Sequence, residues 1–134
     1  MFLTKECDYA MRVIRALADG TKKTVETIST EEQIPKKYAY KIIKKMERES
    51  FVKSVRGRAG GYSLLKPLNT FTVLDVLMAV DSNRYVNECL REDSDCPFKQ
   101  DNKKPCAFHT EFENLQKVIM KELRAKSLAK ILKK

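Results

Sequence analysis

The feature that most constrains the fold of this chain is a pair of helical patterns separated by a three-residue break. Residues 25–32, VETISTEE, place apolar side chains at helical spacing behind a capping Thr24. The break, QIP at residues 33–35, ends in a proline, which starts a helix but cannot continue one. A second helix is therefore predicted over residues 36–48, KKYAYKIIKKMER, and another upstream over residues 4–19. This order is typical of a helix-turn-helix, although any small helical bundle has the same periodicity.

A short basic hairpin is predicted directly after these helices. FVKSVR at residues 51–56 alternates as a strand, GRAGG at 57–61 is a turn, and YSLL at 62–65 is a returning strand. A hairpin in this place is the wing of a winged helix-turn-helix. From Lys36 to Lys66 there are ten Lys and Arg against two Glu, a local net charge of +8 in a chain whose total is +9. A surface that faces only solvent typically carries positive and negative side chains together. This excess of positive charge therefore predicts double-stranded DNA as the partner.

The two basic elements suit different grooves of DNA. Helix 36–48 is predicted to enter the major groove, where base edges can be distinguished. Arginines on a glycine-lined turn suit the narrow minor groove, where the negative potential is concentrated. The residues predicted to contact DNA are Lys36, Lys37, Tyr40 and Lys41 on the helix, and Arg56 and Arg58 on the wing. Tyr38 is predicted to lie in the core, because its neighbours are apolar.

The rest of the chain is predicted to hold a buried helix, an irregular segment and a long amphipathic helix. Residues 72–80, TVLDVLMAV, are apolar on most sides, and periodicity is then lost from 82 to 107. Thr110 and Glu113 form a predicted capping box at the start of the long helix. Its apolar stripe consists of Phe108, Phe112, Leu115, Ile119 and Leu123. Such a stripe needs a partner, and the predicted partner is the same helix in the second subunit of a homodimer.

The predicted fold class is mainly α with a small β wing, in three parts. A winged helix-turn-helix covers residues 1–81, a cysteine-containing sensor loop covers 82–107, and residues 108–134 hold a dimerisation helix and a short C-terminal helix. No stretch approaches the roughly 20 apolar residues of a membrane span, and the N-terminus does not read as a signal peptide, so we expect no membrane partner and a cytoplasmic location. With one histidine and no phosphate-binding glycine loop, we do not expect an enzyme.

Three stretches carry a resemblance to a known family. LTKECDYAMRVIRALA at residues 3–18, IPKKYAYKIIKKM at 34–46 and above all SVRGRAGGYSLLKP at 54–67 resemble the Rrf-two (Rrf2) family of bacterial winged-helix regulators, of the IscR, NsrR and CymR type. The resemblance implies a dimeric transcription factor with crossed long helices at its interface. It implies base reading by Lys37, Tyr40 and Lys41, with Arg56 in the wing. Tyr40 departs from the IscR branch, which has Glu there, so the target DNA sequence cannot be transferred.

The irregular segment holds three of the four cysteines and leads to the only histidine. Several family members bind an iron–sulfur cluster through three cysteines before the long helix, and the resemblance implies Cys89, Cys96 and Cys106 as those ligands. The fourth ligand is implied to be His109, as in the IscR branch, or Asp8 from the other subunit, as in the NsrR branch. A 2Fe-2S cluster is favoured over a 4Fe-4S cluster, with a role in sensing redox state, nitric oxide or iron–sulfur status.

Other uses of the cysteines stay open at the level of sequence. Six and nine residues separate the successive cysteines, which is wider than usual in the family; the extra residues, 100–104, are polar and are predicted to bulge outward. Thiolates suit iron, but zinc accepts a Cys₃His set as well. A thiol–disulfide switch or a small effector, as in a CymR-like repressor, is a further alternative. A zinc-stabilised nucleic-acid or protein interaction module is another. Cys7 is predicted to be a half-buried thiol.

Overall fold

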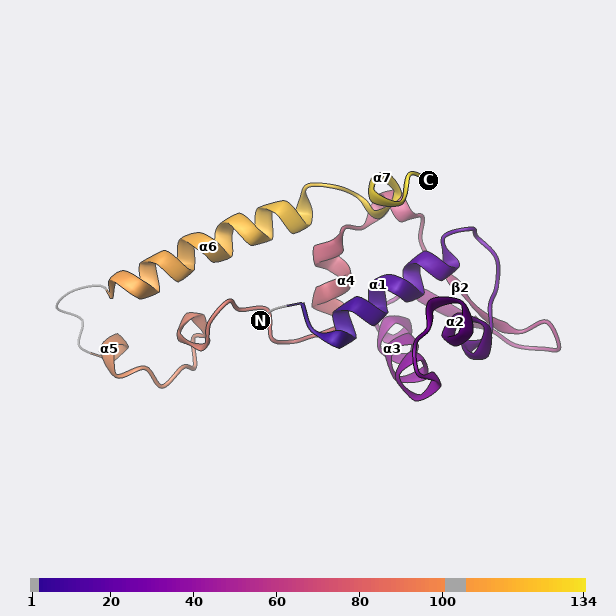
Figure 1. Ribbon diagram of the computed structural model, residues 1–134, viewed down its shortest axis with the longest axis horizontal. Helices are drawn as coiled ribbons and strands as arrows, with labels where there is room; N and C mark the ends of the chain where they lie inside the picture. Colours follow the sequence, from indigo (N-terminus) through magenta and orange to yellow (C-terminus); the bar gives the residue numbers. More distant parts are fainter. Residues whose placement is uncertain (1–2, 101–105) are drawn as a thin grey trace.

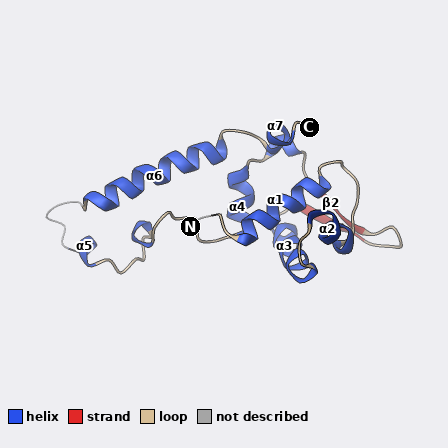
Figure 2. Cartoon of the chain, in the orientation of Figure 1, coloured by secondary structure: helices blue, strands red, loops and turns tan. Residues whose placement is uncertain are grey.

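The computed structural model describes residues 3–100 and 106–134 of the chain (Figure 1). Its elements are, in order, α1 (Lys5–Leu17), α2 (Val25–Glu32), α3 (Lys36–Arg48), β1 (Val52–Val55), β2 (Gly61–Leu64), η1 (Leu68–Thr70), α4 (Val73–Val80), η2 (Glu88–Leu90), α5 (Pro97–Gln100), α6 (Ala107–Arg124) and α7 (Leu128–Leu132). Helices dominate, and β1 and β2 form a small antiparallel sheet (Figure 2). The predicted fold class is confirmed. Residues 101–104 of the predicted bulge lie outside the described part of the chain.

Local signals place the helix-turn-helix where the sequence predicts it. The Thr4 side chain accepts a hydrogen bond from the Cys7 N–H, and Thr24 caps α2 in the same way. Gln33 adopts a left-handed conformation (φ 53°, ψ 48°) that ends α2, and Pro35 then occupies the N-cap of α3. The bounds of α2 and α3 agree with those predicted, because the turn between them carries a local capping or breaking residue at each helix end.

The hydrophobic core lies between α1, α3 and α4. Its largest fully buried side chains include Ile14, Leu17, Ile42, Ile43 and Met46. Tyr38 is not among them, so its predicted core position is wrong. Its side chain is 49% exposed, and the centre of its ring lies 5.9 Å from the centre of the Tyr9 ring. The physical reason is helical rotation, since the fully buried Ala39 takes the inward position one residue later.

The wing is joined to the connection between α1 and α2. In the hairpin, Val52 pairs with Leu64 and Val55 with Gly61. Lys23 and Tyr62 also exchange two backbone hydrogen bonds, of 2.9 and 2.8 Å. Glycine is required where these chains meet, because a Cβ on Gly61 would lie 2.6 Å from the carbonyl oxygen of Lys23. The wing is therefore held against the first two helices.

Beyond α4 the chain forms an arm that extends from the helix-turn-helix, with α6 along one side and the segment from 81 to 100 along the other (Figure 1). Gln116 of α6 joins the two sides: it accepts from the Val86 N–H at 2.7 Å and donates to the Arg84 carbonyl at 2.7 Å. No residue of α6 is fully buried. Leu115 and Val118 are exposed large apolar side chains on this helix.

The predicted capping box at the start of α6 is wrong. The helix begins at Ala107, so Thr110 lies inside it rather than at its N-cap. The Thr110 hydroxyl instead donates to the Cys106 carbonyl at 3.3 Å. The reason is that residues 107–109 are already helical, which places a carbonyl of the preceding turn within reach of the hydroxyl.

The end of the chain returns to the helix-turn-helix. Ser127 caps α7 by accepting from the Lys130 N–H. The Leu128 N–H donates to the Phe71 carbonyl at 3.0 Å, and the Leu128 side chain is fully buried in the core. The C-terminal end of α6 is thereby joined to the core, and α6 itself contacts α4. Within the described residues, every helix is too short or too polar to cross a membrane.

Candidate nucleic-acid interface and cysteine segment

Helix α3 has one buried face and one basic, exposed face. Ala39, Ile42, Ile43 and Met46 are fully buried. The four residues predicted to contact DNA, namely Lys36, Lys37, Tyr40 and Lys41, are all exposed. Tyr40 is 53% exposed despite its large ring. The structure therefore places these side chains on the surface; their contact with DNA stays a prediction.

Two of these lysines are paired with carboxylates of neighbouring helices. Lys36 Nζ lies 2.7 Å from Glu26 Oε1 of α2, and Lys41 Nζ lies 2.9 Å from Glu6 Oε1 of α1. Lys37 forms no ion pair with any described residue. Because DNA phosphates must compete with the two carboxylates, the three lysines are not equivalent donors of positive charge.

Glu6 is the centre of a small network between α1, α3 and α4. Its second oxygen, Oε2, lies 2.6 Å from Lys45 Nζ, which also donates to the Val80 carbonyl at 3.1 Å. The hydrogen bonds from Lys45 and then Lys41 lower the pKa of Glu6 below its ordinary value. No local pattern marks Glu6 as a functional residue, because an acidic residue in a first helical turn is already explained by the helix dipole.

Lys44 connects α3 with the wing. Its Nζ lies 5.7 Å from the centre of the Tyr40 ring and 5.9 Å from the centre of the Tyr62 ring of β2. Lys44 Nζ also lies 3.4 Å from Glu47 Oε1. A cation between two aromatic rings favours a fixed arrangement of the rings, so Lys44 orients Tyr40 relative to the hairpin.

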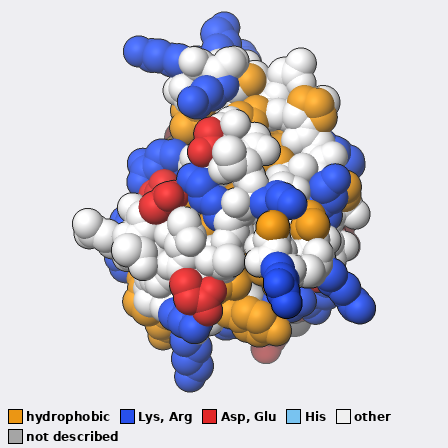
Figure 3. Space-filling view, turned by 90° about the vertical axis from the view of Figure 1, so that its right-hand side faces the viewer, with side chains coloured by type: hydrophobic (Ala, Val, Ile, Leu, Met, Phe, Trp, Pro, Cys, Tyr) orange, Lys and Arg blue, Asp and Glu red, His pale blue; other side chains and the backbone are white. Residues whose placement is uncertain are grey.

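The wing arginines lie at the tip of the hairpin. Arg56 and Arg58 are both exposed, and neither forms an ion pair within the described part of the chain. On this end of the molecule basic side chains are widely spread and acidic ones are few (Figure 3). The two arginines therefore project from the protein with their full charge, as the predicted contact with a phosphate-lined groove requires.

The three cysteines of the irregular segment are all partly exposed and unbridged. Cys89 lies in η2 and Cys96 just before α5, and both line the same hollow. Cys106 is the N-cap residue of α6, and His109 follows in its first turn. Within the described residues of this chain, no three His, Cys, Asp or Glu side chains are grouped closely enough to hold a metal ion. The ligand set stays a prediction.

Asp8 is the other predicted ligand, and it is engaged by other residues of the same chain. Asp8 Oδ2 lies 3.0 Å from Arg12 Nη2, and Arg12 Nη1 donates to the Glu32 carbonyl of α2 at 3.1 Å. Asp8 thus contributes to the contact between α1 and α2. It belongs to the same helical turn as Glu6, so α1 carries a candidate ligand and a contact to α3 two residues apart.

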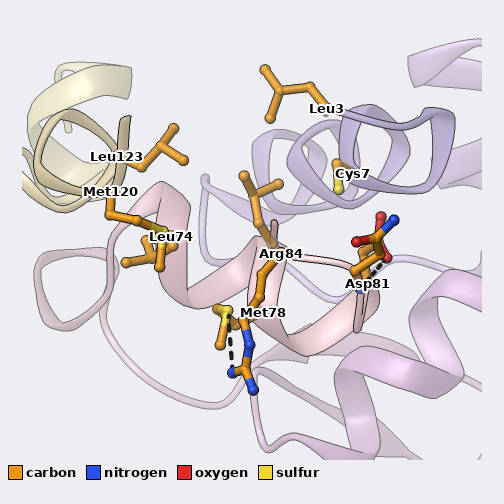
Figure 4. Close-up of a pocket in the computed structure, with 10 residues that line it drawn as sticks. Leu3, Cys7, Leu74, Met78, Asp81, Arg84, Met120 and Leu123 are labelled. Carbon is orange, nitrogen blue, oxygen red and sulfur yellow. Dashed lines mark hydrogen bonds between the residues drawn. The ribbon is translucent and has the colours of Figure 1, made fainter. Parts of the chain in front are cut away.

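Cys7 lies between these two acids, and it is 4% exposed rather than half-buried as predicted. Its thiol accepts from the Thr4 hydroxyl at 3.4 Å. It also lines a small apolar hollow where α1, α4 and α6 meet (Figure 4). Leu74 and Met120 line the other sides of this hollow. Burial against apolar side chains makes Cys7 a packing residue.

Comparison with known proteins agrees with this architecture. The model of a family described as Rrf2, iron-dependent transcriptional regulator, matches residues 3–134. An HTH-type transcriptional regulator of Haemophilus influenzae is 31% identical over 137 residues, which cover 100% of this chain and 88% of that protein. An rrf2-like HTH-type regulator of Rhodobacter capsulatus is 31% identical over 85 residues, or 59% of this chain and 57% of that protein.

Solved structures show the same fold at low sequence identity. CymR, the global cysteine regulator of B. subtilis, superposes with a TM-score of 0.79 at 16% identity, covering 99% of this chain and 97% of CymR. IscR of T. potens superposes with a TM-score of 0.77 at 20% identity, covering 99% of this chain and 87% of IscR. The common fold extends from α1 through α7.

Proposed function

The chain belongs to the Rrf2 family of transcriptional regulators, and from this premise we propose that it binds double-stranded DNA as a homodimer whose affinity is set by an iron–sulfur cluster. Helix α3 enters the major groove and the wing enters the flanking minor groove. The observation that carries the DNA-binding part is the exposure of Lys37, Tyr40 and Arg56 on two elements that Lys44 connects.

A selection experiment tests the DNA-binding part. The protein is used to enrich duplexes from a random library at physiological salt. A two-fold dimer should enrich an inverted repeat with half-site centres about 34–36 Å apart, which is one turn of DNA, or a multiple of it. Enrichment of no sequence, or equal binding of duplex RNA, would contradict the proposal.

The homodimer is supported by the surface of α6. Leu115 and Val118 are exposed on a helix that extends from the core, and burying such side chains against a second copy is favourable. We expect Leu115→Glu to shift the molecular mass from dimer to monomer in light scattering. Asn114→Glu is the matched control, because it adds the same charge to the neighbouring exposed position. If the unsubstituted protein were itself a monomer in light scattering, the proposed homodimer would be contradicted.

The cluster is supported by the chemistry of the available donors. Cys89, Cys96 and Cys106 are unbridged thiols on one continuous segment, and thiolate is the ligand that iron–sulfur clusters take. We propose these three as ligands of a 2Fe-2S cluster, with His109 as the fourth and Asp8 of the second subunit as the alternative. When bound, the cluster supplies a redox-active group that oxidants or nitric oxide can alter.

The protein's own contacts provide a route from the cysteine segment to DNA. Gln116 holds the segment on α6, and η2 packs against the same helix. Helix α6 contacts α4, and α4 contacts both α1 and α3. A change in the cysteine segment therefore acts on the helix that sets the spacing of the two α3 helices. A coupling of about 2–3 kcal/mol would change DNA occupancy on the order of a hundredfold.

Anaerobic purification distinguishes the cluster from its rivals. We expect coloured protein with visible charge-transfer absorption and with iron and acid-labile sulfide, both lost in Cys96→Ala. Comparing His109→Ala with Asp8→Ala identifies the fourth ligand. Colourless protein with one zinc per chain would overturn the cluster in favour of a zinc-stabilised module. Colourless, metal-free protein whose DNA binding responds to thiol oxidants would replace it with a thiol switch.

A further inference from the structure

A shallow hollow lies on the exposed side of the helix-turn-helix, between the first turns of α2 and α3. It is lined by Val25 and Glu26 of α2 and by Lys36, Lys37 and Tyr40 of α3. We propose that this hollow takes the 5-methyl group of a thymine in the major groove, so that Tyr40 and Val25 determine base preference at one position of each half-site. This inference rests on the proposed DNA binding and adds a base-reading contact to it.

The hollow has apolar walls within a basic surface. Val25, which is buried, and Tyr40, which is 53% exposed, supply its apolar lining. Lys36 Nζ at the rim lies 2.7 Å from Glu26 Oε1, so its charge is offset locally. An anionic phosphate oxygen would lose solvation on entering the apolar interior, whereas it can pair with Lys37 at the edge of the hollow without entering. The interior therefore favours an apolar group carried by a polyanion.

Only one group on the major-groove edge of DNA meets this description. Adenine, guanine and cytosine present hydrogen-bonding atoms there, whereas thymine adds a 5-methyl group. Lys37, which also lines the hollow and has no ion pair among the described residues, can attract the DNA backbone. Lys44 Nζ lies 5.7 Å from the centre of the Tyr40 ring, a distance that favours a cation–π contact with this ring. These features fit a thymine methyl between Tyr40 and Val25.

Replacing thymine by uracil tests the inference, because it removes only the methyl group. Starting from the inverted repeat selected above, one thymine pair at a time is replaced by deoxyuridine in both half-sites. We expect a single symmetric position at which affinity falls about fourfold for each methyl removed. Unchanged affinity at every position would overturn the inference and leave the proposed DNA binding intact. Failure to bind any DNA would instead overturn the proposed function.

Variants then assign the discrimination to the hollow. Tyr40→Ala should bind the thymine and uracil duplexes equally at that position, and Tyr40→Phe should restore the thymine preference, since the ring rather than the hydroxyl makes the contact. Tyr38→Ala is the matched control: Tyr38 is exposed to a similar extent on the same helix but does not line the hollow. If Tyr40→Ala instead weakened binding to the thymine and uracil duplexes by the same factor, the preference for thymine would be kept and the assignment would be overturned.

Discussion

Glu6 of α1 accepts a hydrogen bond from Lys41 of α3, with 2.9 Å between Oε1 and Nζ. A lysine on the exposed face of α3 is thus already held by a carboxylate of the same chain. The same carboxylate holds Lys45 at 2.6 Å. Glu6 therefore restrains positive charge on α3 and, at the same time, fixes α1 against it.

Removing the charge of Glu6 should strengthen sequence-independent DNA binding. In Glu6→Gln, Lys41 no longer has to leave an ion pair to reach a phosphate. We expect affinity for random duplex DNA to rise about threefold to tenfold, and the slope of log affinity against log salt to steepen by about one. Fluorescence anisotropy over a salt series measures both.

Glu31→Gln controls for net charge, because Glu31 pairs with Lys23, 2.8 Å away and outside α3. If Glu31→Gln had the same effect as Glu6→Gln, general electrostatics would explain the gain, and the role of the Glu6–Lys41 pair would be contradicted.

The same network should make stability depend on pH in a defined direction. Hydrogen bonds from Lys45 and Lys41 lower the pKa of Glu6 from its ordinary value of 4.5. A carboxyl group with a lowered pKa in the folded state stabilises the fold above its ordinary pKa, and this contribution is lost as pH falls through the lowered value. We expect Glu6→Gln to cost about 1 kcal/mol of unfolding free energy or less at pH 7, given partial exposure, and nothing at strongly acidic pH. Urea denaturation across pH measures this, and a cost independent of pH would contradict it.

Loss of the wing arginine should weaken DNA binding. Arg56 is exposed and forms no ion pair within the described residues, so its charge is fully available to DNA. We expect Arg56→Ala to reduce affinity for the selected duplex about tenfold or more and to make the salt slope shallower by about one. Lys126→Ala, which removes an exposed charge between α6 and α7, should change affinity little. If Arg56→Ala and Lys126→Ala changed DNA affinity equally, the wing would not be part of the DNA interface.

Two wing glycines should differ in their tolerance of alanine. Gly57 and Gly61 both have positive φ, of 113° and 151°, so a side chain strains either position. A Cβ at Gly57 would meet nothing within 4 Å, whereas one at Gly61 would meet the Lys23 carbonyl. We expect Gly61→Ala to destabilise the protein by about 1–3 kcal/mol more than Gly57→Ala, as measured by thermal unfolding. A smaller cost at Gly61 would show that Lys23 and the wing separate easily.

Gln116 should protect the start of the cysteine segment from solvent. Gln116→Leu removes both the acceptor of the Val86 N–H and the donor to the Arg84 carbonyl. We expect hydrogen exchange at the Val86 amide to quicken about threefold to tenfold, as for the loss of one net hydrogen bond. Asn114→Leu, which places the same side chain at an exposed position of the same helix, serves as the control. Unchanged exchange in Gln116→Leu would show that other contacts hold the segment.

Much of the architecture could be predicted from local sequence. The ends of α2 and α3 that face each other are specified by Gln33 and Pro35, and the start of α2 by Thr24; each acts on backbone within a few residues. The wing follows from strand alternation around a glycine-rich turn. The winged helix-turn-helix and the basic residues on its surface could be predicted from the sequence for this reason, since caps, turns and periodicity are all short-range signals.

Contacts between distant residues were decided by the tertiary structure alone. Glu6 and Lys41 are 35 positions apart, and no local pattern indicates that they meet. Leu128 returns to the core beside Phe71, although its own short helix predicts no partner. Tyr38 faces outward because packing selects which face of α3 is inside, a choice that apolar content by itself leaves open. By itself, then, the sequence determined the elements and their chemistry. Which charges are paired, and which surfaces stay available to DNA, depended on packing between helices far apart in the chain.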